Sequence, residues 1–306
     1  MDSEKKIHRS YLGVRLKPVA RVAVLTIFPI KSCKGISLES AECTDMGLKS
    51  GKIKDRHFMV ITNDGKKINA RDEPTLLLVV PSFHDNEMWV DAPDMPTLKI
   101  NLDDIEDRAD DVHLTKIWDV EVGGVHCGSE CANWFKEYLK RDDVMLIHHN
   151  SHVKPKYCVD KDLVKSLVTP EDKAAYADFS CYLLMNRASI FDLNNRITNI
   201  AGIANFRSNI LTSGSPPYSE DSWKYVRIGD NAWFRNVKLC QRCTMIITDA
   251  ETGIRDKQQE ALSALLKYRK AKHIEPAFKQ FDGEAALLGL HLTYDVGDRC
   301  QRTIIF

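Results

Sequence analysis

Cys243 is the residue of this chain whose type and surroundings point most directly to chemistry. It lies beside Arg242 in the segment 239–245, just ahead of the turn 249–253. The thiolate is the form of cysteine that binds a soft metal, and a neighbouring guanidinium and a bound cation both favour ionisation at neutral pH. The sequence therefore predicts a single thiolate ligand for a soft metal at this position.

Other segments carry groups that suit an anionic ligand. The turn 29–35 follows an apolar run and offers Lys31, Ser32 and a glycine to a phosphate, although it lacks the spacing of a Walker loop. Arg56 and Arg207 each precede an apolar run, where a guanidinium can bind phosphate oxygens with two hydrogen bonds. Taken singly, these signals are also typical of solvated turns and surface ion pairs.

The composition predicts an ordinary folded protein of two domains. The 306 residues are 43% hydrophobic and 28% charged, and the formal net charge is +0. Such a chain has no overall field that would attract nucleic acid or an anionic membrane, so any basic site must be local. Nine cysteines without regular spacing indicate reduced thiols inside the cell.

The apolar segment 22–30 bears on location. It is about half the ~20 residues that a membrane-spanning helix needs, and its β-branched residues favour a buried strand. No signal sequence or membrane anchor is expected, and the direct prediction is a cytoplasmic protein.

Short strands separated by polar turns predict a barrel in the first half of the chain. Strands are expected at 22–28, 53–62, 76–80 and 88–90, and an amphipathic helix at 127–140. The polar stretch 148–156, with three histidines, is the expected linker.

The second half is expected to be mixed. Helices are predicted to begin at 170–172 and to span 188–196 and 258–272, with strands at 209–211, 226–228 and 303–305. The basic helix 258–272 is expected to be a solvated face, with docking to an acidic partner as the alternative.

Two alternative chemistries involve the cysteines. Cys240 and Cys243 have the spacing of half a zinc site, and His126, Cys127 and Cys131 were considered as the other half. The register of that second group is wrong for a zinc knuckle, and Cys131 falls on the apolar face of its helix. Nucleophilic catalysis by Cys243 lacks a histidine in a recognisable partner motif, and there is no dinucleotide-binding fingerprint.

Several motifs, taken in order, resemble the MOSC-domain molybdenum proteins, and most closely the mitochondrial amidoxime reducing component family. They are the segments 29–35, 41–48, 55–56, 70–71, 205–207, 220–223, 228–230 and 240–243. The resemblance implies a mixed α/β, predominantly β fold, with an N-terminal MOSC-type β-barrel domain over 18–150 and a MOSC β-barrel domain with peripheral helices over 157–306.

The resemblance also implies a molybdenum cofactor, in which a pterin dithiolene holds the metal and Cys243 supplies the protein thiolate. Soft sulfur ligands suit a redox-active metal, and basic groups suit the phosphate of the cofactor. The cofactor-binding candidates are Lys31, Ser32, Arg56, Phe179, Ser180, Arg207, Asn209, Gln241, Arg242 and Cys243.

The activity implied is the reduction of N-hydroxylated compounds, such as amidoximes and N-hydroxyguanidines. In the family, cytochrome b5 and its NADH-dependent flavin reductase deliver the electrons. Vertebrate members carry a membrane anchor, and no counterpart of it is expected ahead of Val22. The resemblance leaves mitochondrial outer-membrane association open, either because this chain is a shortened isoform or because it binds through partners. Asp249 matches a family position, but no proton-transfer role is assigned to it.

Three positions depart from the family pattern. Ser208 stands where proline is common, Phe179 replaces a small hydroxyl residue, and Gln241 replaces a serine. These changes affect individual contacts more than the cofactor itself. Two rival functions remain: a molybdenum-cofactor carrier or sulfur-handling protein without N-reductive turnover, and a structural zinc protein that binds partners.

Overall fold

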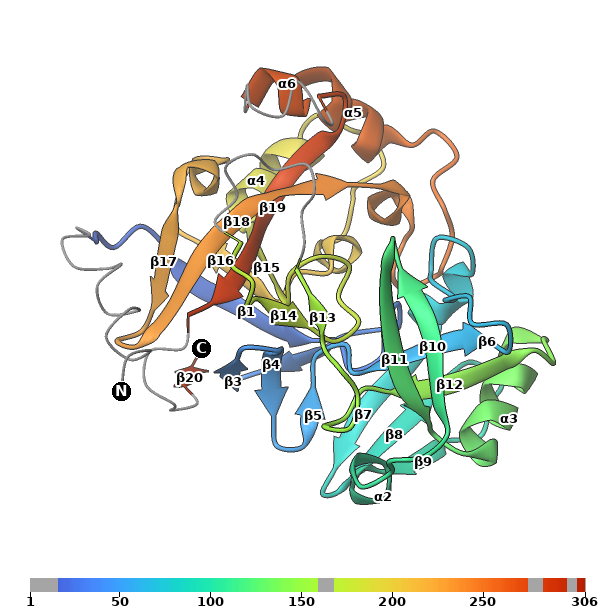
Figure 1. The fold of residues 1–306 in the computed structure, drawn as a ribbon. Helices are drawn as coiled ribbons and strands as arrows, with labels where there is room; N and C mark the ends of the chain where they lie inside the picture. Colours follow the sequence, from blue (N-terminus) through green and yellow to red (C-terminus); the bar gives the residue numbers. More distant parts are fainter. Residues whose placement is uncertain (1–15, 159–167, 275–282, 296–301, 306) are drawn as a thin grey trace, which may run out of the picture.

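The chain is built mainly of β-strands, as the sequence predicts (Figure 1). A computed structural model describes residues 16–158, 168–274, 283–295 and 302–305. Within these ranges the strands form five sheets with two to seven members, and the helices are few and short. The prediction of a mixed α/β, predominantly β fold is confirmed.

The largest sheet joins the two ends of the chain. Its order is β17 (Tyr225–Ile228), β18 (Ala232–Arg242), β19 (Ala286–Tyr294), β15 (Tyr182–Asn186), β16 (Ile210–Ser213), β1 (Arg21–Ile27) and β2 (Ile36–Leu38). Only β15 and β16 run parallel; the other neighbours are antiparallel. Because β1 pairs with β16, the turn after β1 lies close to the second half of the chain.

The other sheets are formed mostly by the first half. One contains β10 (Val112–Ile117), β11 (Val120–His126), β12 (Val144–His148) and β6 (Phe58–Thr62), and another contains β20 (Arg302–Ile305), β3 (Ser40–Thr44), β4 (Gly47–Ser50) and β5 (Ile53–Lys54). The rest are β7 (Val80–His84) with β8 (Glu87–Asp91) and β9 (Leu98–Asn101), and β13 (Lys156–Tyr157) with β14 (Lys173–Ala174). All five residues of β6 are buried, so this strand lies in the core.

The helices cover the sheets. They are α2 (Leu102–Glu106), α3 (Ser129–Leu139), α4 (Arg187–Asn194), α5 (Glu260–Tyr268) and α6 (Ala271–Ile274), with short 3₁₀ turns η1 (Pro74–Leu78), η2 (Ile203–Phe206), η3 (Ser219–Ser222) and η4 (Thr244–Ile247). The amphipathic helix expected at 127–140 is α3, which buries Trp134 and Phe135. In the described ranges, none of the helices has the length and apolar character needed to cross a bilayer.

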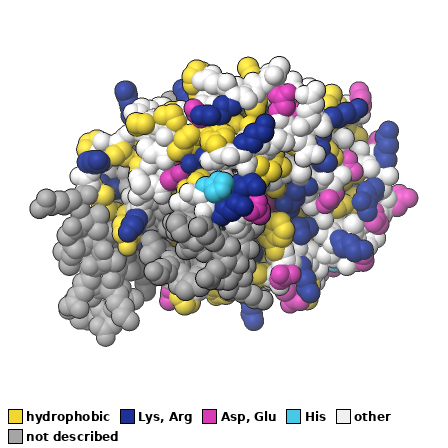
Figure 2. All heavy atoms as spheres, turned by 90° about the horizontal axis from the view of Figure 1, so that it is seen from above, with side chains coloured by type: hydrophobic (Ala, Val, Ile, Leu, Met, Phe, Trp, Pro, Cys, Tyr) yellow, Lys and Arg dark blue, Asp and Glu magenta, His cyan; other side chains and the backbone are white. Residues whose placement is uncertain are grey.

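Figure 2 shows the face above α5 and α6, where basic and apolar side chains are interspersed. The expected helix 258–272 is two helices, and the break between them falls at Arg269 and Lys270, where the Arg269 side chain is buried. Arg269 Nε donates to the carbonyl of Leu287 at 3.1 Å, and Arg269 Nη2 donates to Asp221 at 3.0 Å. The solvated basic face that was expected therefore has one buried arginine within it.

Three further predictions of secondary structure were wrong. The expected strand 53–62 is interrupted at Asp55 and Arg56, where the backbone of Arg56 is left-handed (φ 52°). The segment 74–78 is a 3₁₀ turn that Pro74 begins, followed by the strand β7. No helix begins at 170–172; Asp172 Oδ2 instead accepts the backbone N–H of Thr169 at 2.7 Å and closes a turn.

The start of the expected linker 148–156 is buried. His148 ends β12 opposite Phe58, and the N–H of His149 donates to the carbonyl of His57 at 2.8 Å. The Asn150 side chain donates to three carbonyls at the end of α2, the closest being that of Arg108 at 2.7 Å. A polar segment can therefore be buried when distant elements provide hydrogen-bond partners for its polar groups.

Candidate functional site

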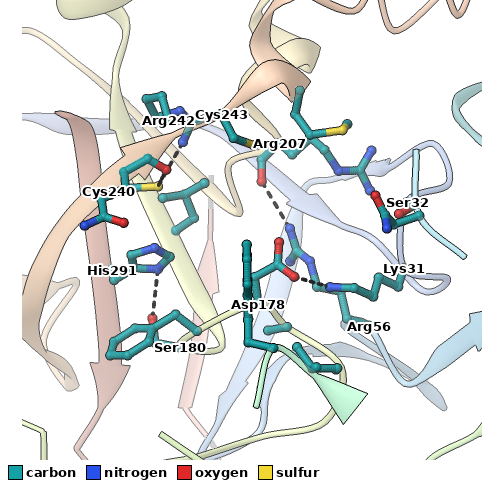
Figure 3. Close-up of a pocket in the computed structure, with 18 of the residues that line it drawn as sticks. Lys31, Ser32, Arg56, Asp178, Ser180, Arg207, Cys240, Arg242, Cys243 and His291 are labelled. Carbon is teal, nitrogen blue, oxygen red and sulfur yellow. Dashed lines mark hydrogen bonds and ion pairs between the residues drawn. The ribbon is translucent and has the colours of Figure 1, made fainter. Parts of the chain in front are cut away.

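A single cavity of about 640 Å³ brings together all ten residues singled out from the sequence (Figure 3). They come from the turn after β1, the break before β6, the segment ahead of β15, the η2–β16 connection and the end of β18. The fold thus places side chains from positions 31 to 243 around one space. Their roles in binding remain predictions.

Lys31 forms the base of the cavity together with Asp178. Lys31 Nζ donates to the carbonyl of Tyr176 at 2.9 Å and to Asp178 Oδ1 at 2.6 Å. Burial lowers the pKa of Lys31, and Asp178 partly offsets this. Burial raises the pKa of Asp178, but the nearby ammonium outweighs it and the net shift is downward. The 2.6 Å contact joins the two groups as an ion pair on the lining of the cavity.

Asp55 fixes the arginine and amide candidates from behind the cavity. This side chain is 1% exposed, and its oxygens accept from the Phe28 N–H at 2.8 Å, Asn209 Nδ2 at 3.0 Å and Arg56 Nη1 at 2.5 Å. Arg56 Nη2 also donates to the carbonyl of Arg207 at 3.2 Å. One carboxylate thus connects the end of β1, the start of β6 and the start of β16.

Arg207 lines the same cavity and lies against the same Phe28 ring as Arg56. Its guanidinium carbon lies 4.4 Å from the ring centroid, and that of Arg56 lies 4.7 Å from it. Arg207 Nη2 donates to the carbonyl of Cys33 at 2.7 Å. Burial lowers the pKa of Arg207 to about 10, and the proximity of Arg56 adds to this, yet the group stays charged at neutral pH.

The backbone is left-handed at several of these positions. Ser32, Arg56 and Arg207 have φ values of 73°, 52° and 54°. Side chains with a Cβ adopt this region at a cost, and such residues tend to cluster at functional sites, where the surrounding structure holds them. The cationic groups of the cavity are therefore held partly by strained turns.

Cys243 differs from every other cysteine in the described ranges, because it alone is not buried. It follows β18 directly and its backbone is extended before η4. Arg71 Nη1 lies 3.9 Å from Cys243 Sγ. The guanidinium is thus placed beside the sulfur, where it can donate to it.

Cys240, by contrast, is buried and contacts a neighbouring protein side chain. It is 5% exposed, burial raises its pKa, and its sulfur lies 3.1 Å from Arg242 Nη1. Arg242 Nη2 donates to the carbonyl of Phe206 at 2.9 Å, while the buried Arg242 Nε has no hydrogen-bond partner within the part of the chain that the structure describes. A buried unpaired N–H is a donor that suits a polar ligand.

The segment ahead of β15 adds Phe179 and Ser180 to the cavity. Ser180 Oγ donates to the carbonyl of Tyr182 at 3.2 Å and lies 3.3 Å from His291 Nδ1. The Phe179 ring is packed edge-on against His291 and lies 3.7 Å below Lys238 Nζ. Burial lowers the pKa of His291 well below its usual range, so the ring is neutral.

Sequence reasoning missed several residues of the cavity. Lys238 lies two residues before Cys240 and four before Arg242 on β18. Alternate residues of a strand share a face, so this spacing is the sequence signal that predicts Lys238 as a lining residue. Lys156 was assigned to the linker, yet it is buried and its ammonium donates to the carbonyls of residues 177–179. Burial lowers the pKa of Lys156 to about 8. His291 and Trp118 had no sequence signal.

The cavity is cationic although the chain is neutral overall. Of the described residues that line it, seven are lysines or arginines (Lys31, Arg56, Arg71, Lys156, Arg207, Lys238 and Arg242) and two are aspartates (Asp119 and Asp178). This basic site is local, as the zero net charge of the chain requires of any such site. It fits an anionic ligand with several hydrogen-bond acceptors.

The zinc alternative finds no support. The parts of the chain that the structure describes contain no group of three or more His, Cys, Asp or Glu placed to hold a metal ion. Cys127 and Cys131 are buried, and His126 contacts His113 and Asp111. Asp249 does not line the cavity; its Oδ1 accepts from the N–H groups of Glu251 and Thr252 in its own turn.

Two family models match the chain. The MOSC N-terminal beta barrel domain matches residues 19–142, and the MOSC domain matches residues 171–286. The chain is 34% identical over 289 residues to the human mitochondrial amidoxime-reducing component 1, covering 92% of this chain and 83% of the relative. It is 33% identical over 296 residues to the human mitochondrial amidoxime reducing component 2, covering 95% and 85%.

Proposed function

Because the chain belongs to the MOSC-domain family that includes the mitochondrial amidoxime-reducing components, we propose that it is a molybdenum-cofactor-dependent oxidoreductase that reduces N-hydroxylated compounds. The observation that carries the proposal is the position of Cys243. This half-buried thiol opens into a cavity whose other polar groups are mostly cations.

The residues of the cavity fit the chemistry of a pterin dithiolene with a phosphate. Lys31, Arg56 and Arg207 offer charged donors. Arg242 offers a buried N–H that has no partner among the described residues, and Ser180 offers a hydroxyl. Cys243 would be the protein ligand of the metal, because a thiolate suits molybdenum among soft donors.

When bound, the cofactor would supply the metal and the electron pair for cleavage of an N–O bond. The overall reaction consumes two electrons and two protons and releases the reduced nitrogen base and water. The chain contributes the sulfur ligand, the charged cradle and the cavity. Arg71 Nη1, 3.9 Å from the sulfur of Cys243, would donate to that sulfur and help to orient it.

The three departures from the family pattern lie at different distances from this chemistry. Phe179 offers its ring to Lys238 and His291, where a hydroxyl would offer a hydrogen bond. Ser208 is buried between Arg207 and Asn209. Both neighbours are bound by the side chains of Asp55 and Arg56, which we call the Asp55 junction: Asn209 donates to Asp55, and Arg56 donates to the carbonyl of Arg207. Gln241 lines the cavity beside Arg242. Contacts from Phe179 are the ones expected to differ.

The decisive experiment measures molybdenum and pterin in protein made by a host that synthesises molybdenum cofactor. Wild type is compared with Cys243→Ser and, as a matched control, with Cys240→Ser. We expect near-stoichiometric molybdenum and pterin in wild type and in Cys240→Ser. Cys243→Ser should lose molybdenum or alter its spectrum and should lose amidoxime reduction.

The same samples separate the rival functions. Zinc in place of molybdenum, lost in both variants, would support the structural zinc protein. Pterin with a persulfide on Cys243, and no reduction of an amidoxime, would support a carrier or sulfur-handling protein. Full activity in Cys243→Ser would refute the role of the thiolate.

We extend the proposal to electron delivery and location. From the family resemblance, the electrons would come from cytochrome b5 and its NADH-dependent reductase. From the names of the relatives, the protein would associate with mitochondria. Reconstitution with these two proteins should support NADH oxidation that depends on an amidoxime. Activity with a chemical reductant but not with the two proteins would point to another donor.

A further inference from the structure

One wall of the cavity is not used by the proposed cofactor contacts. It is the tip of the hairpin between β10 and β11, where Trp118 and Asp119 form a two-residue turn between the paired Ile117 and Val120. All four residues line the cavity. In Figure 1 the green hairpin extends from the first half of the chain towards the orange segment that follows β18, which carries Cys243.

Trp118 is an unusual residue for this turn. Its φ is 54°, a left-handed value that Gly, Asn or Asp normally provides in two-residue hairpin turns. The side chain is 59% exposed, whereas the other four tryptophans are buried or half-buried. A bulky ring in a strained turn that gains little burial points to a use for the ring itself.

Arg71 connects this ring to the proposed metal ligand. The guanidinium carbon of Arg71 lies 5.0 Å from the Trp118 ring centroid, and Nη1 lies 3.9 Å from Cys243 Sγ. Arg71 is itself fixed, because its Nε donates to Asn69 Oδ1 at 3.2 Å and its carbonyl accepts from Arg255 at 2.6 Å. The ring is therefore held at a defined place beside the reaction centre.

The chemistry of this wall differs from the rest of the cavity. Trp118 and Val120 offer a planar and apolar surface, with the buried Ile117 behind them, while the polar lining of the cavity is mostly cationic. An aromatic group stacks on indole in an offset or edge-on geometry. The Arg71 and Lys67 cations near the ring, at 5.0 Å and 5.8 Å, disfavour a positively charged group at the same place.

We infer that the hairpin tip is a substrate subsite, in which Trp118 binds the uncharged aryl group of an N-hydroxylated substrate while its N–OH end faces Cys243. This inference rests on the proposed function and specifies its substrate class. It predicts a preference for aryl amidoximes over alkyl amidoximes of the same charge.

Trp118→Gly is the informative variant, because glycine suits the left-handed turn and removes only the ring. Trp118→Phe retains an aromatic surface. Leu114→Ala is the matched control, since Leu114 is 58% exposed on the same hairpin but does not line the cavity. The probes are benzamidoxime and acetamidoxime, with reduced methyl viologen as the electron donor.

We expect Trp118→Gly to raise KM for benzamidoxime by about three- to tenfold, the size of an aromatic pair contact, with KM for acetamidoxime and kcat for both unchanged. Trp118→Phe should recover most of the affinity, and Leu114→Ala should match wild type. Equal effects of Trp118→Gly on both substrates, or no effect on either, would overturn the subsite.

Calorimetric titration of benzamidoxime without a reductant gives a second readout that does not need turnover. Weaker binding to Trp118→Gly than to wild type supports the subsite even if neither amidoxime is reduced, in which case only the proposed activity fails. Reduction of both amidoximes with identical benzamidoxime affinity in the two proteins would leave the activity standing and refute the subsite.

Discussion

Asp55 and Glu220 are two buried carboxylates with different surroundings. Asp55 has a guanidinium among its donors, that of Arg56 at 2.5 Å. Glu220 is 0% exposed, and its side chain accepts from the neutral groups Ser189 Oγ at 2.7 Å and Asn186 Nδ2 at 3.1 Å. Burial raises the pKa of Glu220, and the neighbouring hydroxyl and amide only partly offset this.

The comparison explains how a neutral chain builds a cationic cavity. Asp55 neutralises part of the charge of Arg56 from behind and orients Asn209, so cations can be packed together without facing one another unpaired. Glu220 connects α4 to the η3 turn, outside the cavity, and its partners need no charge. Asp55 therefore orients groups that line the cavity, whereas Glu220 connects elements outside it.

The largest effect is expected for Asp55→Ala. The variant leaves a buried guanidinium, an amide and the N–H of Phe28 without their acceptor. Breaking a buried ion pair on one side costs about 3–5 kcal/mol of unfolding free energy. Urea unfolding followed by circular dichroism would measure it.

Asp55→Asn is the control for shape, since it retains one acceptor oxygen and should cost less. If Asp55→Ala lost under about 1 kcal/mol, the junction would not hold the cavity wall, and the contrast with Glu220 would disappear.

The sequence identified the cationic candidates but not the group that organises them. Lys31, Arg56, Arg207 and Cys243 were found because their side-chain types suit the chemistry and their motifs occur in order. The sequence predicts Asp55 as part of a strand and gives no sign of its role. Its hydrogen-bond donors are distant in sequence or depend on the break at Arg56, so the sequence alone does not reveal them.

The remaining errors have the same physical origin. The segment 148–150 is polar, and only its partners in β6 and α2 make it part of the core. Trp118 occupies a turn position at which sequence rules expect glycine or asparagine. The predominantly β fold was predictable, because it depends on many short alternating segments rather than on single contacts.

An intermediate effect is expected from the histidines behind the Asp55 junction. His148 lies near His149, Lys54 and Glu106, and its ring contacts His57 and Phe58. Burial lowers the pKa of His148 to about 3, and Lys54 and His149 add to this.

Below about pH 6.5 the unfolded chain binds a proton at His148 that the folded chain does not, so stability falls as the pH falls. Between pH 7 and pH 5 this one group costs about 2 kcal/mol of unfolding free energy. His148→Phe, which retains a ring against Phe58, should remove that part of the pH dependence in urea titrations at both pH values. An unchanged difference between the two pH values would show that His148 is protonated in the folded protein.

The smallest effect is expected for Glu220→Gln. Because the folded pKa of Glu220 is raised, its contribution to stability is greatest below the unfolded value of about 4.3 and is lost as the pH rises. At pH 7 the wild type bears the cost of a buried charge, which glutamine avoids while giving up one acceptor for Asn186 or Ser189. These changes oppose each other, so the unfolding free energy should change by about 1 kcal/mol or less.

The sharper test of Glu220→Gln is the pH dependence rather than the value at pH 7. Wild type should lose stability relative to the variant between pH 4.5 and pH 7, as measured by urea unfolding across that range. A loss of about 3 kcal/mol or more at pH 7 would mean that the charge of Glu220 is needed. Glu220 would then resemble Asp55, as a buried carboxylate whose charge the fold requires. The contrast between the two carboxylates would no longer explain how the cavity holds its cations.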